Sequence, residues 1–260
     1  MVSASASPQL NGAVIGYTGY RERLQAPVRR REVPQPFVVM ILSFGDHMRA
    51  GGQDQVSFAV GLGEKPDLTE HAGTQHGVQV NLNPLAATAL LGIPARQLTQ
   101  RVVDLEALLG REARRLSDRL YEATSWPARF DLLDRYLEAR LAGGSQASSQ
   151  IGYAMGRMVR SRGRVRVDAL AREVGWSRRT LSQRFHEEVG LPPKRFARLR
   201  RFQSAVGLLR NGRHGSLATV AHAAGYADQA HFNHEFLTLA GCTPRQFIAA
   251  RIPGEAGVSA

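Results

Sequence analysis

The sequence predicts an α+β fold in two parts, with strands and a helical hairpin before an all-helical C-terminal part. Three observations support this prediction. Short runs rich in Val, Ile and Phe come first, and leucines at helical spacing follow them from Pro84 onward. The stretch AGGSQASSQ, residues 142–150, has no apolar periodicity and the composition of a flexible linker. Beyond it, one apolar helical pattern occurs twice.

Three segments of the N-terminal part are predicted to be strands. FVVMILSF (37–44), QVSFAVGL (55–62) and HGVQVNL (76–82) are short, rich in Val, Ile and Phe, and lie close to Gly, Asp or Asn. The first of them is continuously apolar, which is typical of a strand buried on both faces. These strands favour a small β-barrel or a β-sandwich.

Two helices are predicted after the strands. Leucines recur at helical spacing over residues 105–120, and Asp104 can cap the start of that helix. A second helix is predicted over about residues 128–141. The break at Ser125-Trp126-Pro127 between them favours an antiparallel helical hairpin.

The net charge of +12 is unevenly divided along the chain. Residues 1–150 hold 16 Lys and Arg against 15 Asp and Glu, a net of +1, whereas residues 151–260 hold 18 against 7, a net of +11. A basic surface kept only for solubility would not require such a division. The C-terminal part is therefore expected to bind a polyanion, with nucleic acid favoured.

Membrane and secreted proteins are disfavoured. No run of about 18 apolar residues could span a bilayer, and the N-terminus lacks the basic and apolar regions of a signal peptide. The single cysteine, Cys242, excludes an internal disulfide and a Cys-rich zinc site. We expect a cytoplasmic protein that binds no membrane.

The C-terminal part contains an internal repeat. GWSRRTLSQRF begins at Gly175, and GYADQAHFNHEF begins 50 residues later at Gly225. Each copy starts with Gly and an aromatic residue and ends with Phe. The second copy has one extra residue, so that later matches, such as Pro193 with Pro244, are offset by 51.

Each copy has the features of a helix-turn-helix. A short helix ends at Gly, a capping residue follows (Ser177 or Asp228), and the next helix carries two apolar residues four positions apart. Such a motif places its second helix in the DNA major groove. Between the copies, an apolar stripe predicts a connecting helix over Pro193–Arg210, about 27 Å long. That length is near the roughly 34 Å between successive major-groove faces on one side of B-DNA.

A set of residues runs in order through both copies and the helix between them. Its members are Leu170-Ala171, Gly175-Trp176-Ser177, Leu181, Phe185, Gly190, Pro193, Phe196, Arg201, Ala205, Leu208-Leu209, Val220-Ala221, Gly225-Tyr226, Phe232, Phe236, Gly241 and Thr243-Pro244-Arg245-Gln246-Phe247. Through this set, residues 151–252 resemble the AraC/XylS family of bacterial transcriptional regulators. The resemblance implies two helix-turn-helix subdomains on a long linker helix, and control of transcription in response to a signal.

The DNA-binding candidates fall into two groups by their chemistry. Base edges or the adjacent backbone are assigned to Arg178, Arg179, Ser182 and Gln183 in the first copy and to Gln229, His231, Asn233 and His234 in the second. Phosphate contacts are assigned to the basic residues Arg184, Lys194, Arg195, Arg198 and Arg245. Trp176 and Tyr226, at matching positions of the two turns, are interpreted as core. Arg201 is interpreted as a tie between the two subdomains.

Regulators of this kind usually carry a separate sensing or dimerisation domain. We assign that role to residues 12–141, the linker to 142–150 and DNA binding to 151–252. Double-stranded operator DNA is the expected partner, on the nucleoid. An unidentified small-molecule effector, RNA polymerase and a second copy of the chain are further candidate partners.

No enzyme, cofactor or metal site is predicted. His71 and His76 lie near acidic residues, but the glycine-rich, irregular stretch around them favours a solvated loop. The acids are Glu64, Asp67 and Glu70. Cys242 is interpreted as a packing residue, with oxidant sensing as the alternative. A non-specific architectural DNA-binding protein, and an enzyme with an attached DNA-binding module, are the competing hypotheses.

Overall fold

The computed structural model describes residues 1–212 and 215–250, and the backbone alone of 258–259. The last two residues of the predicted DNA-binding domain, 151–252, lie outside this part. The chain forms two compact units, one of residues 1–29, 37–62 and 69–147 and another of residues 30–36, 63–68 and 148–260. Over the described residues, none of the helices has the length and apolar character needed to cross a bilayer.

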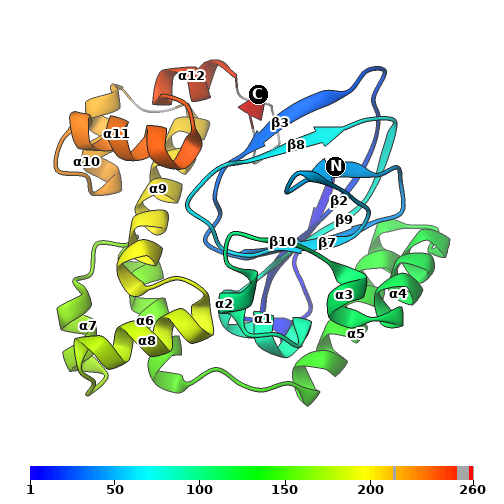
Figure 1. Cartoon of the computed structure of the whole chain (residues 1–260), viewed down its shortest axis with the longest axis horizontal. Coiled ribbons are helices and arrows are strands. Elements are labelled where there is room, and N and C mark those ends of the chain that lie inside the picture. Colours follow the sequence, from blue (N-terminus) through cyan, green and yellow to red (C-terminus); the bar gives the residue numbers. More distant parts are fainter. Residues whose placement is uncertain (213–214, 251–257, 260) are drawn as a thin grey trace. The chain divides into compact units, whose positions relative to one another are not determined.

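The fold is α+β, with two antiparallel sheets among the N-terminal strands (Figure 1). The six-stranded sheet has the order β1-β2-β9-β4-β7-β10. Its strands are β1 Val2–Ala4, β2 Val14–Arg23, β9 Thr74–Leu82, β4 Val38–Ser43, β7 Phe58–Val60 and β10 Val102–Asp104. Because β1 and β10 are free edges, the sheet is open. A closed barrel, one of the two predicted arrangements, is therefore wrong.

The second sheet has the order β11-β3-β8-β5-β6. Its strands are β11 Val258–Ser259, β3 Val28–Glu32, β8 Asp67–His71, β5 Met48–Ala50 and β6 Gln53–Gln55. The predicted strand 55–62 is thus too long, since residue 55 belongs to β6 and only Phe58–Val60 forms β7. The predicted solvated loop from Gly61 to His76 is also wrong in part, because it contains β8 and the start of β9.

The strand β4 is buried as predicted from its continuous apolar run. Five of its six residues are buried, since β4 lies inside the sheet between β9 and β7. Its Ile41 packs in an apolar cluster with Met48, Ala50 and Phe58.

The helices of the first unit follow the strands. They are α1 Pro84–Leu91, α2 Ala95–Leu98, α3 Leu105–Leu109, α4 Arg111–Glu122 and α5 Trp126–Gly143, with a one-turn 3-10 helix, η1, at Pro8–Leu10. The predicted single helix over 105–120 is wrong, because Gly110 breaks it with φ 60° and ψ −144°. Asp104 caps α3 as predicted, since its Oδ1 accepts from the N–H of Ala107 at 3.0 Å.

The predicted antiparallel hairpin forms between α4 and α5. Near the turn, Arg129 Nε donates to the carbonyl of Leu120 at 2.8 Å. At the far end, Arg140 donates to Glu112 Oε2 at 2.9 Å. The break at Ser125 is shorter than predicted, because its hydroxyl caps α5 and Trp126 begins the helix.

The C-terminal part of the chain is helical. Its helices are α6 Ser149–Arg160, α7 Val167–Glu173, α8 Arg178–Val189, α9 Pro193–Asn211, α10 Leu217–Ala224, α11 Gln229–Ala240 and α12 Pro244–Ala249. The inward face predicted for α6 is buried except for Val159, which is 37% exposed. Helices α5 and α6 both extend into the predicted linker, leaving residues 144–148 between them.

Candidate nucleic-acid interface

The first helix-turn-helix consists of α7 and α8. Gly175 follows α7 with φ 71°, a left-handed conformation that lets the chain turn sharply. The hydroxyl of Ser177 then accepts from the N–H of Thr180 at 3.0 Å and caps α8. Leu181 and Phe185 are completely buried, so the other faces of α8 point outward, as the sequence predicts.

The second copy, α10 and α11, repeats these devices. Gly225 ends α10 with φ 88°, and Asp228 Oδ1 accepts from the N–H of His231 at 2.7 Å to cap α11. Phe232 and Phe236 are buried. We call α8 and α11 the recognition helices.

The core of each copy contains the same aromatic contact. Phe185 and Phe196 lie with ring centroids 5.6 Å apart, and the equivalent pair, Phe236 and Phe247, lies 5.4 Å apart. The helix α9 joins the copies over 19 residues, about 28 Å at the usual rise. Its buried stripe is the predicted one, Phe196, Leu199, Phe202, Val206 and Leu209. Tyr226 is buried as expected, whereas Trp176 is only half-buried.

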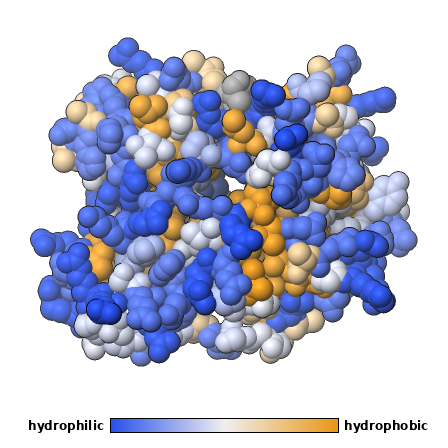
Figure 2. All heavy atoms as spheres, in the orientation of Figure 1, coloured by the Kyte–Doolittle hydropathy of each residue, from blue (hydrophilic) through white to orange (hydrophobic). Residues whose placement is uncertain are grey.

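Four predicted base contacts of the first copy share one shallow, open depression. Arg178, Arg179, Ser182 and Gln183 line it together with His186 and Pro192, which sequence reasoning missed. Figure 2 shows mostly hydrophilic side chains over the visible face of α7 and α8. His186 lies four positions after Ser182, on the same face of the helix, so its spacing could have identified it.

Acidic neighbours accompany the basic side chains of this copy. Arg178 lies 3.4 Å from Asp168, and Arg184 lies 4.0 Å from Glu187. Gln183 donates to the same Glu187 at 3.2 Å. These pairs are solvent-exposed, so they contribute little to stability and leave the side chains able to exchange partners.

In the second copy, only two of the four predicted base contacts have exposed side chains. His231 and His234 are exposed, and Gln229 and Asn233 are half-buried. Asn233 Oδ1 is buried without a hydrogen-bond partner among the described residues, so Asn233 does not present its whole amide to solvent.

The predicted phosphate contacts lie mainly on the first turns of α9. Lys194, Arg195 and Arg198 line one cleft with Arg201 and His231. The cleft also holds two carboxylates that sequence reasoning missed as functional groups, Glu64 and Glu235. Arg245 lies apart from them, exposed on the first turn of α12.

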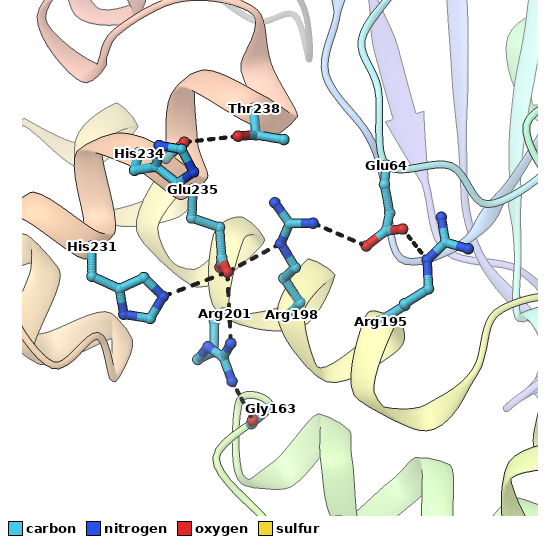
Figure 3. A network of polar contacts seen from close by, with 9 residues as sticks. All are labelled: Glu64, Gly163, Arg195, Arg198, Arg201, His231, His234, Glu235 and Thr238. Carbon is cyan, nitrogen blue, oxygen red and sulfur yellow. Dashed lines mark hydrogen bonds and ion pairs between the residues drawn. The ribbon is translucent and has the colours of Figure 1, made fainter.

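Both carboxylates are buried and paired with arginines (Figure 3). Arg195 Nε donates to Glu64 Oε2, and Arg198 lies 3.4 Å from Glu64 Oε1. Arg198 Nε also lies 3.1 Å from Glu235 Oε2. A glutamate at the fourth position after His231 was the available signal for Glu235, whereas nothing in the sequence pointed to Glu64.

Arg201 connects the two subdomains, as expected. It donates to the carbonyl of Gly163, beyond α6, at 3.4 Å and lies 3.8 Å from Glu235 in α11. Its guanidinium also lies over the ring of Tyr226, 5.9 Å from the centroid. Burial, with the nearby Glu235 carboxylate, raises the pKa of Tyr226.

Comparisons with known proteins agree with this architecture. A model described as a helix-turn-helix domain matches residues 170–250, and a domain of unknown function (DUF6597) matches residues 3–104. A comparison with curated proteins gives no significant match.

Three solved structures illustrate the likeness. An apo variant of ToxT from Vibrio cholerae is 9% identical with a TM-score of 0.51, over 95% of this chain and 99% of that one. Wild-type ToxT with bound unsaturated fatty acid is 10% identical with a TM-score of 0.49, over 92% and 95%. The C-terminal domain of AraT, a response regulator from Geobacillus stearothermophilus, is 22% identical with a TM-score of 0.39, over 43% and 93%.

The ToxT variant shares the fold of this chain over nearly its whole length. The model that matches residues 170–250 is that of a helix-turn-helix domain, the motif that the structure contains twice. The C-terminal part of the chain, with its two helix-turn-helix copies on one connecting helix, carries the helix-turn-helix domain of that family model and has the architecture that the resemblance to AraC/XylS regulators implies.

Proposed function

We propose that the chain is a transcriptional regulator of the AraC/XylS type. It would bind a specific operator sequence as a single chain, with α8 and α11 in successive major grooves. The observation that carries the proposal is the structural repeat, in which two capped recognition helices are fixed to one helix of 19 residues. Two equivalent recognition helices joined by the connecting helix α9 could enter two successive major-groove segments on the same side of the duplex.

The two recognition helices would contribute differently. In α8, Arg178, Arg179, Ser182 and Gln183 combine charge with hydrogen-bonding groups suited to base edges. In α11, the candidates Gln229, His231, Asn233 and His234 carry less positive charge. We therefore expect the first helix to supply more of the affinity.

The basic residues around the helices would hold the DNA backbone. Arg184, Lys194, Arg195, Arg198 and Arg245 are assigned to phosphates, which set affinity and register but not sequence. We assign DNA binding to residues 151–252. Control by a small-molecule effector or by dimerisation is assigned to residues 12–141. RNA polymerase is a further proposed partner. We place the protein in the cytoplasm, on the DNA of the nucleoid.

The experiment that tests this function is selection of bound sequences from a random DNA pool with the full chain. Two enriched blocks about one helical turn apart would support reading by both helices of one chain. One enriched block alone would indicate that α11 contacts the DNA backbone without contributing to sequence preference. No enrichment at all would favour the architectural hypothesis over a sequence-specific regulator.

Variants sharpen this selection. Arg179→Ala is expected to weaken binding and relax the preference in one block, because a bidentate arginine contact discriminates bases by about 1–3 kcal/mol. Arg115→Ala is the matched control, since Arg115 is exposed on α4 in the other unit. An unchanged sequence preference in Arg179→Ala would remove this residue from base readout.

A further inference from the structure

The segment Gly63–Leu68 belongs to the same compact unit as the helix-turn-helix copies, although it lies far from α6 and the later helices in sequence. Glu64 pairs this segment with α9, and only 8% of the Glu64 side chain is exposed. A carboxylate removed from water to this extent requires charged partners. Glu64 has two of them, Arg195 and Arg198, both on α9 (Figure 3).

These two arginines are candidates for contacts with DNA phosphate. Arg195 keeps 48% of its side chain exposed, and Arg198 keeps 28%. A carboxylate and a phosphate oxygen accept from a guanidinium in the same way, so that one occupant excludes the other from the same N–H groups. While Glu64 lies in the cleft, its carboxylate occupies guanidinium N–H groups of Arg195 and Arg198 that a DNA phosphate would need.

The network continues from Glu64 to the second recognition helix. Arg198 bridges Glu64 to Glu235, whose Oε2 lies 3.8 Å from His231 Nε2 on the first turn of α11. Glu64 and His231 line the same cleft, so the Glu64 carboxylate shares this cleft with a predicted base contact of α11. Pro66 of the same segment lies beside Gly241, the residue that follows α11.

We propose that Glu64 is an intramolecular competitor of DNA phosphate. It holds Arg195 and Arg198 and so weakens DNA binding by the helix-turn-helix domain until the segment Gly63–Leu68 leaves the cleft. This inference rests on the proposed DNA binding of the same surface. It adds a regulatory contact made by a segment that lies far from the helices in sequence.

The first test is the substitution Glu64→Gln in the full chain, which keeps the shape of the side chain and removes its charge. We expect the Kd for DNA to fall by about tenfold, because two arginines become available to phosphates. The plot of log K against log salt concentration should steepen by up to about 2, at about 0.9 for each phosphate contact. Equal or weaker binding by a folded Glu64→Gln chain would overturn the proposal.

Two further substitutions make the test specific. Glu70→Gln removes the same charge from the neighbouring strand β8, where Glu70 pairs with Arg29 at 2.9 Å, and is expected to leave the Kd unchanged. Arg195→Ala is expected to weaken binding more in the Glu64→Gln background than in the natural chain. An effect of Arg195→Ala that is equal in both backgrounds would show that Glu64 does not compete for this residue.

A measurement on the natural chain covers the case in which Glu64→Gln fails to fold. A Glu-specific endoprotease cleaves after Glu64 only when this buried side chain becomes accessible. Adding DNA should therefore increase cleavage at Glu64 relative to cleavage at Glu106, whose side chain is 48% exposed. Unchanged or reduced cleavage at Glu64 in the DNA complex would show that the segment stays in place.

The outcomes separate this inference from the proposed function. A chain that selects a DNA sequence, but binds it with the same Kd before and after the Glu64→Gln substitution, would keep the function and lose the inference. Conversely, non-specific DNA binding that Glu64→Gln strengthens would keep the competition and lose sequence-specific regulation, because phosphate contacts do not depend on sequence.

Discussion

Arg198 Nε lies 3.1 Å from Glu235 Oε2, so an ion pair joins the connecting helix α9 to the second recognition helix α11. Only 8% of the Glu235 side chain is exposed, against 28% for Arg198. Arg201 and His231 each lie 3.8 Å from the same carboxylate oxygen. Glu235 therefore stabilises the packing of α11 against α9 through its contacts with Arg198 and Arg201.

Glu235→Gln is expected to lower the free energy of unfolding by about 1–3 kcal/mol, because it leaves partly buried arginines without their shared carboxylate. Urea unfolding measures this change. Glu187→Gln is the control, since Glu187 is 40% exposed and lies 4.0 Å from Arg184, and its loss should cost less than about 1 kcal/mol. Equal losses in the two variants would contradict a structural role for the buried pair.

The helix caps of the two copies give a second prediction. Ser177→Ala and Asp228→Ala should each destabilise the chain by about 1 kcal/mol, since each removes an acceptor for a free N–H at the start of a recognition helix. Asp228→Asn should retain most of the stability, because the amide oxygen still caps α11. If Asn and Ala at position 228 are equally destabilising in denaturant unfolding, the cap is not the cause.

The sequence predicted the C-terminal fold well because its local signals agree with its packing. Positive φ at Gly175 and Gly225, the caps at Ser177 and Asp228, and the buried stripe of α9 all follow from residue type and spacing. The repeat added an internal check, since the glycine and the cap each occur in both copies.

The N-terminal fold was less predictable because non-local pairing determines it. The strand β2, Val14–Arg23, carries glycines and charged residues, so its sequence does not resemble the apolar runs from which strands were predicted. Its pairing with β9 also has an irregular register near Val14. It forms because β9 pairs with it along almost its whole length. The helix prediction failed for a local reason. The leucines keep their helical spacing across Gly110, although this residue ends α3 and separates it from α4.

The candidate site was predictable one helix at a time. Outward positions on α8 follow from the buried Leu181 and Phe185. Glu64 could not be assigned in this way, because its contacts with Arg195 and Arg198 join residues 131 and 134 positions apart. The sequence pattern around it indicated a solvated loop, and only the three-dimensional packing shows a buried carboxylate.

Cys242 gives a prediction about chemical reactivity. The thiol is buried, and burial raises its pKa in spite of the opposing effect of Arg31. Because the thiolate is the nucleophile, iodoacetamide should alkylate the native chain at least about tenfold more slowly than the urea-unfolded chain. A cysteine placed at the exposed Ala227 in a Cys242→Ala background is the control and should react rapidly. Rapid labelling of native Cys242 would instead support oxidant sensing.

The pH dependence of stability gives the last prediction, which concerns His76 in β9. Burial and the nearby cations Arg129 and Arg21 lower the pKa of His76 from its ordinary value of 6.5. The unfolded chain therefore binds this proton more readily, and the stability that His76 contributes is present above about pH 6.5 and is lost as the pH falls below it. Thermal unfolding at about pH 5.5 and 7.5 should show a smaller difference in Tm for His76→Gln than for the natural chain. His47→Gln, at an exposed position, should retain the natural difference, and an equal difference in all three chains would show that His76 is not the group responsible.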